Sequence, residues 1–399
     1  MSTTTEPYIN LLDPDWYVDP WAAYRWLRDE SPVHWDPVQE LWGISRYADV
    51  LEVEKRTDLY TSFPGSRPKI DQSADQSMIN MDDPGHQEQR KLVVRRFTPR
   101  GVRNHEERVR ALADRLIDEA TAGGARSFEV VEQVASRLPA MVIAEILGYE
   151  PEQWRVIRRV SEETMYFAGQ TRADGVAMST RPMSEDAINE WAQVTLEVVA
   201  KRRAEARDDL ISVWCHSETD GRPWDDVKVL DETILLVDGG AETTRTVIGS
   251  ITRELAVRHE VQRQLREHPE MMTNAVEEFI RWVSPILNMR RTATTDHELH
   301  GRPIRQGQEL LLLYPSANRD ERVYERPDEF DVTRERNHHV AFGFGTHVCL
   351  GAALARLELR VMFEQLLSRL PQWRLVPGTE PRILPATFAR AYDAVHIEF

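Results

Sequence analysis

A cysteine at the start of a predicted helix is the first residue of this chain whose type and position point to chemistry. Cys349 is one of only two cysteines and lies in HHVAFGFGTHVCLGAALARLE, residues 338–358. Gly343 and Gly345 permit a tight turn with positive φ, and a helix is predicted from about Leu350. Unpaired backbone N–H groups at a helix start favour the anionic form of a thiol. We therefore expect Cys349 to be a thiolate.

These residues alone leave three uses of the thiolate open. It is a buried structural cysteine, a nucleophile activated by His347, or a metal ligand. A nucleophile needs an oriented base and an oxyanion hole, which nothing in the sequence singles out. Zinc is disfavoured because a thiolate zinc site adds further ligands at close spacing, and only His347 qualifies. Gly351 leaves room for something flat to press against the backbone.

A second stretch, LLVDGGAETTRTVIG, places two glycines inside the longest predicted helix. Gly239 and Gly240 each cost about 1 kcal/mol relative to alanine there. Local rules broken in this way often mark function. Glu242 and Thr243 add an acid beside a hydroxyl that can bond a preceding carbonyl. The competing interpretation is a helix weakened by glycine whose threonines bond to their own turn.

Helical periodicity dominates the elements that must position these residues. Helices are predicted at 101–122, 132–148, 150–167, 185–207, 226–256, 270–283 and 350–369. Strands are predicted at 292–299, 309–314 and 373–398, the last broken by PGTEP, with an early pair around 32–45. The fold class is therefore mainly α with small β-sheets. Segments 61–82 and 165–184 mix Gly, Pro and large apolar residues and are candidate lids.

Bulk composition excludes some partners. Fifty basic against sixty-six acidic residues give a net charge of −16, which argues against nucleic acid as a global partner. The N-terminus has no signal-peptide pattern, and no segment is apolar enough to cross a membrane. Two cysteines cannot form a disulfide framework. We expect a cytoplasmic protein.

The stretch FGFGTHVCLG, Phe342 to Gly351, resembles the haem-binding loop of the cytochrome P-450 superfamily, FGxGxHxCxG, at every fixed position. The resemblance implies haem b (iron protoporphyrin IX) as cofactor, with Cys349 as the axial ligand of the iron and Phe342 shielding its sulfur. A single thiolate leaves the opposite face open for O₂. The implied fold is the triangular, mainly helical prism of this superfamily, as a single domain over residues 1–399.

The GGAETT run is similar to the oxygen-activating helix of the same superfamily, [AG]Gx[DE]T[TS]. By this resemblance Thr243 supports dioxygen and Glu242 relays protons from solvent, while Gly239 and Gly240 let the cofactor approach the helix. Productive cleavage of O–O needs protons at the distal oxygen only. A haem sensor or store needs neither residue.

Other residues match the superfamily at its scaffold and at its haem carboxylates. Glu278 and Arg281 form its ExxR pair, and Arg334 falls at the third position of that network. The contacts implied for the two haem propionates are His86, Arg90, Arg291 and His347. Arg291 has Arg290 beside it as an alternative.

Apolar residues near the predicted lids and the oxygen helix indicate a large hydrophobic ligand. The substrate-pocket candidates are Met78, Ile79, Leu236, Val237, Ile286, Met289 and Phe388. The stretches VDGGAETTRTVIGS and MINMDDPGH look like the actinobacterial branch that hydroxylates the terminal methyl of cholesterol or cholest-4-en-3-one side chains. Onward oxidation to a carboxylic acid is implied. The alternative is a monooxygenase of another lipid or terpenoid.

An enzyme of this type takes two electrons from elsewhere, and the chain has no flavin or iron–sulfur motif. A separate ferredoxin and its reductase are therefore implied. The basic segment from Arg90 to Arg110 and the pair Arg356 and Arg360 are expected on the thiolate side, as a docking face. The other classes considered are a haem-thiolate peroxygenase, a non-catalytic haem sensor and a cysteine hydrolase without haem.

Overall fold

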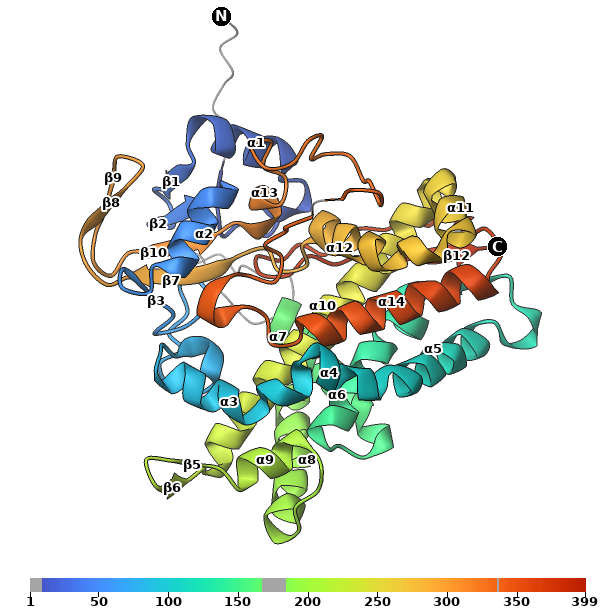
Figure 1. Cartoon of the computed structure of the whole chain (residues 1–399), viewed down its shortest axis with the longest axis horizontal. Coiled ribbons are helices and arrows are strands. Elements are labelled where there is room, and N and C mark those ends of the chain that lie inside the picture. The colour runs from blue at the N-terminus through green and yellow to red at the C-terminus, as the bar shows by residue number, and fades with distance from the viewer. Residues whose placement is uncertain (1–8, 167–183, 336) are drawn as a thin grey trace, which may run out of the picture.

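The computed structural model describes residues 9–166, 184–335 and 337–399. Over these residues the chain is mainly helical with small sheets, as the sequence predicts (Figure 1). The helices are α1 (Trp21–Glu30), α2 (Tyr47–Lys55), α3 (Gly85–Phe97), α4 (Pro99–Val102), α5 (Glu106–Ala120), α6 (Arg137–Leu147), α7 (Trp154–Tyr166), α8 (Glu185–Ala204), α9 (Leu210–Cys215), α10 (Asp226–Val257), α11 (His259–Glu267), α12 (Met272–Val283), α13 (Tyr314–Ala317) and α14 (Ala352–Arg369).

Helix α10 is the axis of the helical part and crosses the molecule obliquely behind α14 and the chain that leads into it (Figure 1). It begins at the N-cap Asp225, whose side chain accepts a hydrogen bond from the Lys228 N–H at 2.9 Å. It packs against α6 and α7 on one side and against α12 and α14 on another. Its residues are therefore mostly buried. Side chains on one face of the helix pack in the core, and those on another face line a cavity.

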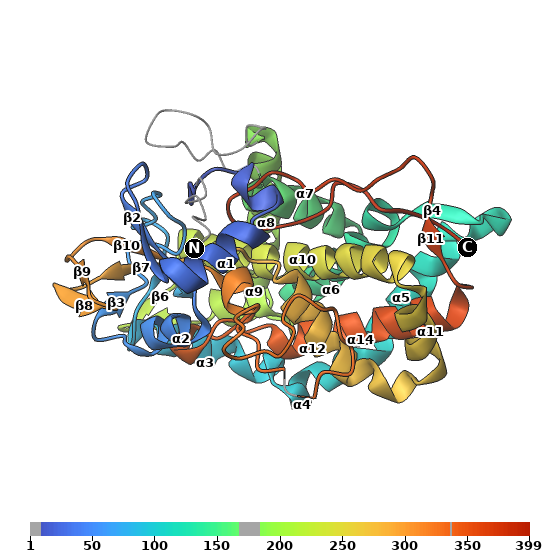
Figure 2. The ribbon, with the colours of Figure 1, turned by 90° about the horizontal axis from the view of Figure 1, so that it is seen from above.

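The strands gather mainly at one end of the molecule (Figure 2). The largest sheet has the order β1-β2-β10-β7-β3 and is antiparallel except where β10 runs parallel to β2. The strands are β1 (Val33–Asp36), β2 (Leu41–Ile44), β3 (Tyr60–Thr61), β4 (Ser127–Glu129), β5 (Glu218–Thr219), β6 (Arg222–Pro223), β7 (Met289–Ala293), β8 (His297–Leu299), β9 (Arg302–Ile304), β10 (Glu309–Leu312), β11 (Arg374–Leu375) and β12 (His396–Glu398).

The predicted helices are all present, with shifted ends, and the early strand pair is confirmed as β1 and β2. Helices α1, α2, α9, α11 and α13 were missed, because short helices give periodicity too few turns to show. In the predicted strand region 373–398, β11 lies before the PGTEP break and β12 at the end, while the chain between them forms only isolated bridges, Ile383 with Tyr392 and Ala389 with Ile286. Helix α3 has a charged or amide residue at most positions and follows only from the family resemblance.

The structure also bears on the two predicted lids and on the absence of a predicted membrane span. The predicted lid 61–82 is largely irregular chain; it begins at Thr61, the last residue of β3, and includes a short 3₁₀ turn, Met78–Asn80. The second predicted lid, 165–184, lies outside the described residues except at its ends. Within the described ranges, none of the helices combines the length and the apolar character needed to cross a bilayer.

Candidate active site

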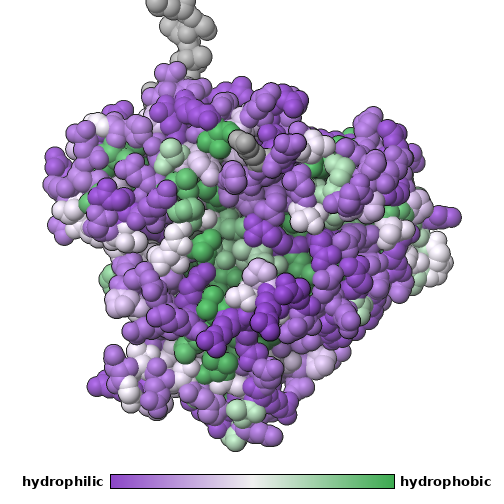
Figure 3. All heavy atoms as spheres, in the orientation of Figure 1, coloured by the Kyte–Doolittle hydropathy of each residue, from purple (hydrophilic) through white to green (hydrophobic). Residues whose placement is uncertain are grey.

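A cavity opens between α10 and the segment that leads into α14. Its volume is about 290 Å³. Gly239 and Thr243 line one wall, while Phe342 and Cys349 line the wall opposite. In the space-filling view, apolar side chains gather near the centre of the face, around the start of α14 (Figure 3). The two sequence stretches singled out for their chemistry thus face a shared space.

Glycines shape the turn that presents Cys349. Gly343 and Gly345 have φ of 66° and 72°, as the sequence predicts. A Cβ on Gly345 would lie 2.8 Å from the backbone oxygen of Glu54, so α2 also packs close here. The Cys349 N–H donates to the Phe342 carbonyl at 2.8 Å and closes the loop. Helix α14 follows from Ala352, within two residues of the predicted start.

The thiol itself corrects one expectation. Cys349 has accessible surface, but that surface faces the cavity rather than bulk water. Burial raises the pKa of the Cys349 thiol above its ordinary value, although the N–H groups of Gly351 and Ala352 and the charge of Arg90 act to lower it. The helix start is therefore not enough to ionise the thiol. A cation bound at the sulfur would supply what is missing, because a coordinating thiol is deprotonated.

The glycine pair of α10 divides its work. A Cβ on Gly239 would meet no atom within 4 Å, so this position is open to the cavity as predicted. A Cβ on Gly240 would lie 2.8 Å from Cγ1 of Ile143, so Gly240 also lets α6 approach α10. Thr243 Oγ1 donates to the Gly239 carbonyl at 2.8 Å and lines the cavity. The hydroxyl is thus in place, held by its own turn.

Glu242 points away from the cavity, which the sequence did not predict. Only 1% of its surface is exposed, and its Oε2 accepts from Arg245 Nη1 at 2.7 Å. Its Oε1 accepts from Ser161 Oγ of α7 at 3.2 Å. Burial raises the pKa of Glu242, opposed by Arg245. A proton leaving Glu242 for the cavity therefore requires this ion pair to rearrange.

One end of the cavity is cationic. All four predicted propionate contacts, His86, Arg90, Arg291 and His347, line it. The two imidazole rings lie 4.1 Å apart. Burial and the charge of Arg291 lower the pKa of His347 to about 3, so that it is neutral until an anion joins it.

The arginines of this end are held from outside. Arg90 Nη2 donates to the Val348 carbonyl at 2.6 Å. Arg291, and not Arg290, faces the cavity; Arg290 Nη1 instead donates to Glu309 at 2.9 Å. This resolves the alternative left open by the sequence. His347 Nε2 contacts Ser62 Oγ at 3.1 Å, which does not favour a role as base for Cys349.

The residues that line the cavity fit haem b. A Cβ on Gly351 or Gly239 would meet no atom within 4 Å, which leaves flat space on both walls. Two arginines and two histidines meet where two carboxylates need cations. In the part of the chain that the structure describes, no three His, Cys, Asp or Glu side chains form a cluster able to hold a bare metal ion. The donor set is thus one thiol, which suits a metal carried by its own macrocycle.

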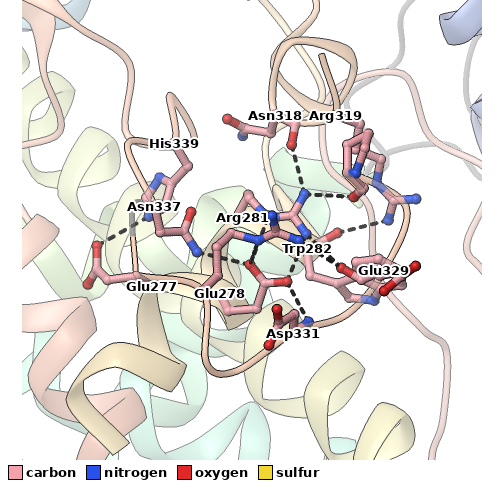
Figure 4. A network of polar contacts seen from close by, with 12 residues as sticks. Glu277, Glu278, Arg281, Trp282, Asn318, Arg319, Glu329, Asp331, Asn337 and His339 are labelled. Carbon is pink, nitrogen blue, oxygen red and sulfur yellow. Dashed lines mark hydrogen bonds and ion pairs between the residues drawn. The ribbon is translucent and has the colours of Figure 1, made fainter. Parts of the chain in front are cut away.

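The predicted scaffold network is buried away from the cavity (Figure 4). Glu278 and Arg281 have no exposed side-chain surface and share two hydrogen bonds of 2.7 Å. Arg334 Nε donates to Glu278 at 3.3 Å. Arg281 also donates to the carbonyls of Asn318 and Pro327, both at 2.9 Å. The three residues form the structural network that was predicted.

The substrate-pocket candidates divide by helical face. Met78, Ile79, Leu236, Ile286, Met289 and Phe388 all line the cavity. Val237 does not: its side chain is fully buried in the hydrophobic core. A step of one residue turns a side chain by about 100° around a helix, which moves Val237 away from the face of Leu236.

Sequence reasoning missed the polar lining of the cavity. Arg67, Asp238, Glu54 and Glu358 all line it. Arg67 lies in the segment 61–82, where only apolar residues were considered as contacts. Asp238 directly precedes Gly239 in the quoted stretch. A charged residue on the cavity face of a helix is a signal that was available and not used.

Comparisons with known proteins agree with this geometry. The family model for cytochrome P-450 matches residues 34–392. The steroid C26-monooxygenase of Mycobacterium tuberculosis (strain ATCC 25618 / H37Rv) is 39% identical over 99% of this chain and 98% of its own. The linalool 8-monooxygenase of Pseudomonas putida is 31% identical over 92% and 93%.

Solved structures give the same result. The cytochrome P-450 CYP268A2 of Mycobacterium marinum, in complex with pseudoionone, matches with a TM-score of 0.88 and 29% identity over 100% of both chains. CYP109E1 of Bacillus megaterium, in complex with testosterone, matches with a TM-score of 0.83 and 27% identity over 96% of this chain and 99% of that one.

Proposed function

Because the chain belongs to the cytochrome P-450 family, whose members are haem-dependent monooxygenases, we propose that it hydroxylates the terminal methyl of a sterol side chain. Cholesterol and cholest-4-en-3-one are the proposed substrates, with onward oxidation of the primary alcohol to the carboxylic acid. Support for the substrate class comes from three mycobacterial steroid C26-monooxygenases at 38–39% identity.

The observation that carries the proposal is the opposition of Cys349 and Thr243 across one cavity. The thiol lies in a glycine turn at the start of α14, and the hydroxyl lies on α10 beside the open position of Gly239. A cysteine hydrolase would need a base on the thiol, and His347 instead contacts Ser62. A haem holder without oxygen chemistry would need no hydroxyl there.

The overall reaction converts a C–H bond into C–OH with one atom of O₂, and the other atom leaves as water after taking two electrons and two protons. Bound haem supplies the iron chemistry that activates O₂. The chain would hold it through Cys349 and through His86, Arg90, Arg291 and His347 at the carboxylates. Leu236, Ile286 and Met289 give the apolar wall that orients the substrate and excludes water.

Protons reach the cavity through α10 in this proposal. Thr243 Oγ1 exchanges its bond with the Gly239 carbonyl for a bond directed into the cavity. Glu242 lies one residue earlier, in an ion pair with Arg245. Release of that pair turns the buried acid toward Thr243. Burial raises the pKa of Glu242, so that a carboxyl freed from Arg245 takes up a proton more readily and can then donate it.

A ferredoxin is proposed as the electron donor, reduced by its own reductase. Lys91, Arg95, Arg100 and Arg103 are exposed around α3 and α4. Three apolar side chains, Leu92, Phe344 and Val348, are also exposed, and the Val348 carbonyl accepts from Arg90 of α3. Exposed basic and apolar side chains together suit an acidic protein partner. Arg356 and Arg360 add less than predicted, because Glu277 and Glu106 already pair with them at 2.7 and 2.8 Å.

Both cysteines are free, which agrees with the cytoplasmic location that forms part of the proposal.

The second candidate function is oxidation of a terpenoid. It is favoured by the relative named linalool 8-monooxygenase and by the structural match that holds pseudoionone. Both candidates use the same residues and differ only in the substrate.

Spectroscopy tests the proposal first. The reduced protein with carbon monoxide is expected to show the long-wavelength Soret band of thiolate ligation, and Cys349→Ala is expected to lack it. Titration of the oxidised holoenzyme with cholest-4-en-3-one should then shift the iron from low to high spin. Mass spectrometry after turnover with a ferredoxin and reductase should find the terminal alcohol and acid. A shift from low to high spin with acyclic terpenoids, and no shift with sterols, would select the second candidate.

A further inference from the structure

Two opposite charges lie in the wall of the cavity. Arg67 comes from the 61–82 segment and Asp238 from α10, and both line the cavity. Their side chains keep only 13% and 16% of their surface exposed. Removing charges from water costs free energy that only good geometry and further hydrogen bonds offset. A pair of this kind in a substrate cavity calls for a function.

Each charge is fixed from its outer side. Arg67 Nη1 donates to the Thr164 carbonyl at 2.6 Å, and its guanidinium lies 4.4 Å from the ring centre of Phe388. Asp238 Oδ1 accepts a hydrogen bond from the hydroxyl of the same Thr164. The segment 61–82, α7 and α10 therefore hold both groups in place.

The contact between the two charges is loose. Arg67 Nη2 and Asp238 Oδ2 are 3.5 Å apart, against about 2.7–2.9 Å in a good arginine–carboxylate pair. Burial raises the pKa of Asp238 to about 7 in spite of Arg67, and burial lowers the pKa of Arg67. The two groups compensate each other only in part. One more polar atom between them would complete the site.

We propose that Arg67 and Asp238 recognise one neutral oxygen of the substrate, a hydroxyl that accepts from the guanidinium and donates to the carboxylate. This inference rests on the proposed monooxygenase function. A ketone satisfies Arg67 alone, and a carboxylate is disfavoured because it would be repelled by Asp238. A site built to bind a hydroxyl holds an analogue that lacks it, such as cholesterol, less tightly, since its buried polar groups are then left unpaired.

The position of the pair on α10 locates that hydroxyl in the substrate. Asp238 precedes Thr243 by five residues, about 7.5 Å along the helix axis. The oxidised carbon lies beside Thr243, so the recognised oxygen lies several bonds away. The ring oxygen of a sterol is at the far end of the molecule from its terminal methyl. The preferred sterol therefore carries a hydroxyl on the side chain, between the ring system and the oxidised methyl.

Dissociation constants of two matched ligands test the assignment. Cholesterol and 22-hydroxycholesterol are titrated into the holoenzyme by calorimetry, with the spin-state shift as a second signal. The wild type is expected to bind 22-hydroxycholesterol about 10- to 100-fold more tightly. Arg67→Leu together with Asp238→Leu removes both charges without leaving one unpaired, and should bring the ratio of the two constants to about one.

Asp231 provides a matched control. It lines the same cavity from α10, seven residues before Asp238, and its Oδ2 already accepts the Gln76 N–H at 2.9 Å. Asp231→Asn is expected to keep the wild-type ratio. If Arg67 and Asp238 had a purely structural role, the double variant would bind both ligands more weakly by the same factor, and the ratio of the two dissociation constants would stay at the wild-type value.

Three results would overturn the inference. Equal affinity of the wild type for both ligands removes the recognition site while the sterol proposal stands. A preference that survives in the double variant places the hydroxyl elsewhere. Failure of both ligands to bind an enzyme with a normal carbon monoxide band rejects the sterol substrate and this inference together. A missing band instead refutes the haem-thiolate function itself.

Discussion

Two Glu–Arg pairs with the same spacing lie on two neighbouring helices and differ in what surrounds them. Glu278 and Arg281 on α12, and Glu242 and Arg245 on α10, are each three residues apart, buried, and joined by a contact of 2.7 Å. Sequence spacing does not distinguish them. Their environments do, and the environments decide which pair is scaffold and which can take part in chemistry.

The α12 pair is bonded on every side. Arg281 donates to carbonyls of Asn318, Pro327 and Glu329, while Glu278 accepts from Arg334, Asn337 and the Asp331 N–H. The α10 pair has far fewer partners: Ser161 on the acid, and the Tyr166 ring 5.4 Å from the guanidinium. A side chain held by few bonds next to a cavity can move. We infer that the first pair is fixed and the second rearranges.

The largest expected effect comes from breaking the fixed pair. Arg281→Met leaves the Glu278 carboxylate buried and removes the donor from three carbonyls, so the free energy of unfolding should fall by about 3–5 kcal/mol. Urea unfolding followed by tryptophan fluorescence measures it. Arg334→Met removes the 3.3 Å contact with Glu278 and the bonds to the carbonyls of Glu325, Arg326 and Glu329 at the more exposed edge of the network, and should cost less, about 1–3 kcal/mol. Equal midpoints for Arg281→Met and the wild type would contradict the role of the network.

Breaking the second pair should affect turnover more than stability. Glu242→Gln keeps one acceptor oxygen for Arg245 and turns an amide N–H to Ser161, but it has no acidic proton to give, so product formation should fall by about 100-fold or more. The free energy of unfolding should fall by only about 1–3 kcal/mol. Glu242→Asp should restore much of the rate, because it returns the acid. A Gln variant with wild-type turnover would remove Glu242 from the proton route.

The comparison also shows how far sequence alone could go. The Cys349 turn was predictable because its glycines and the helix start are neighbours in the chain. The partners of Arg67 and Glu242 were not, because Asp238 lies 171 residues from Arg67 and Ser161 lies 81 residues from Glu242. Val237 was wrongly predicted to line the cavity. It directly follows Leu236, and one step along a helix turns the side chain to another face. The predicted ionisation of Cys349 was wrong for the thiol by itself, because burial raises its pKa by more than the helix start lowers it.

A third buried glutamate gives the limiting case, an acid without an arginine. Glu358 on α14 lines the cavity, and its Oε2 has no hydrogen-bond partner among the described residues. Burial raises the pKa of Glu358 well above its ordinary value. The folded protein therefore keeps a proton that the unfolded chain releases above about pH 4.3, and folding stability is lost as pH rises from there toward the folded pKa.

Glu358→Gln should remove this loss. The stability of the variant relative to the wild type is expected to grow by up to about 1.4 kcal/mol per pH unit above pH 4.3. Urea unfolding of both proteins at pH 5, 6, 7 and 8 measures the difference. A difference that stays constant over this range would show that Glu358 is ionised in the fold, and so has a partner that the structure does not show.

The smallest effect on folding, and the sharpest on chemistry, is expected at Thr243. Within the described part of the chain, its hydroxyl bonds only to the Gly239 carbonyl of its own turn, at 2.8 Å. Thr243→Ala should therefore change stability by no more than about 0.5 kcal/mol and leave substrate affinity unaltered. Without that hydroxyl beside the cavity, a several-fold larger share of the electrons should appear as hydrogen peroxide instead of product. Thr252→Ala is the matched control, because Thr252 makes the same 2.8 Å bond to Ile248 on the same helix but is fully buried and does not line the cavity. If the two variants release equal peroxide, the delivery of protons depends on the side-chain bond to the preceding turn of α10, which both variants lose, and not on the hydroxyl in the cavity.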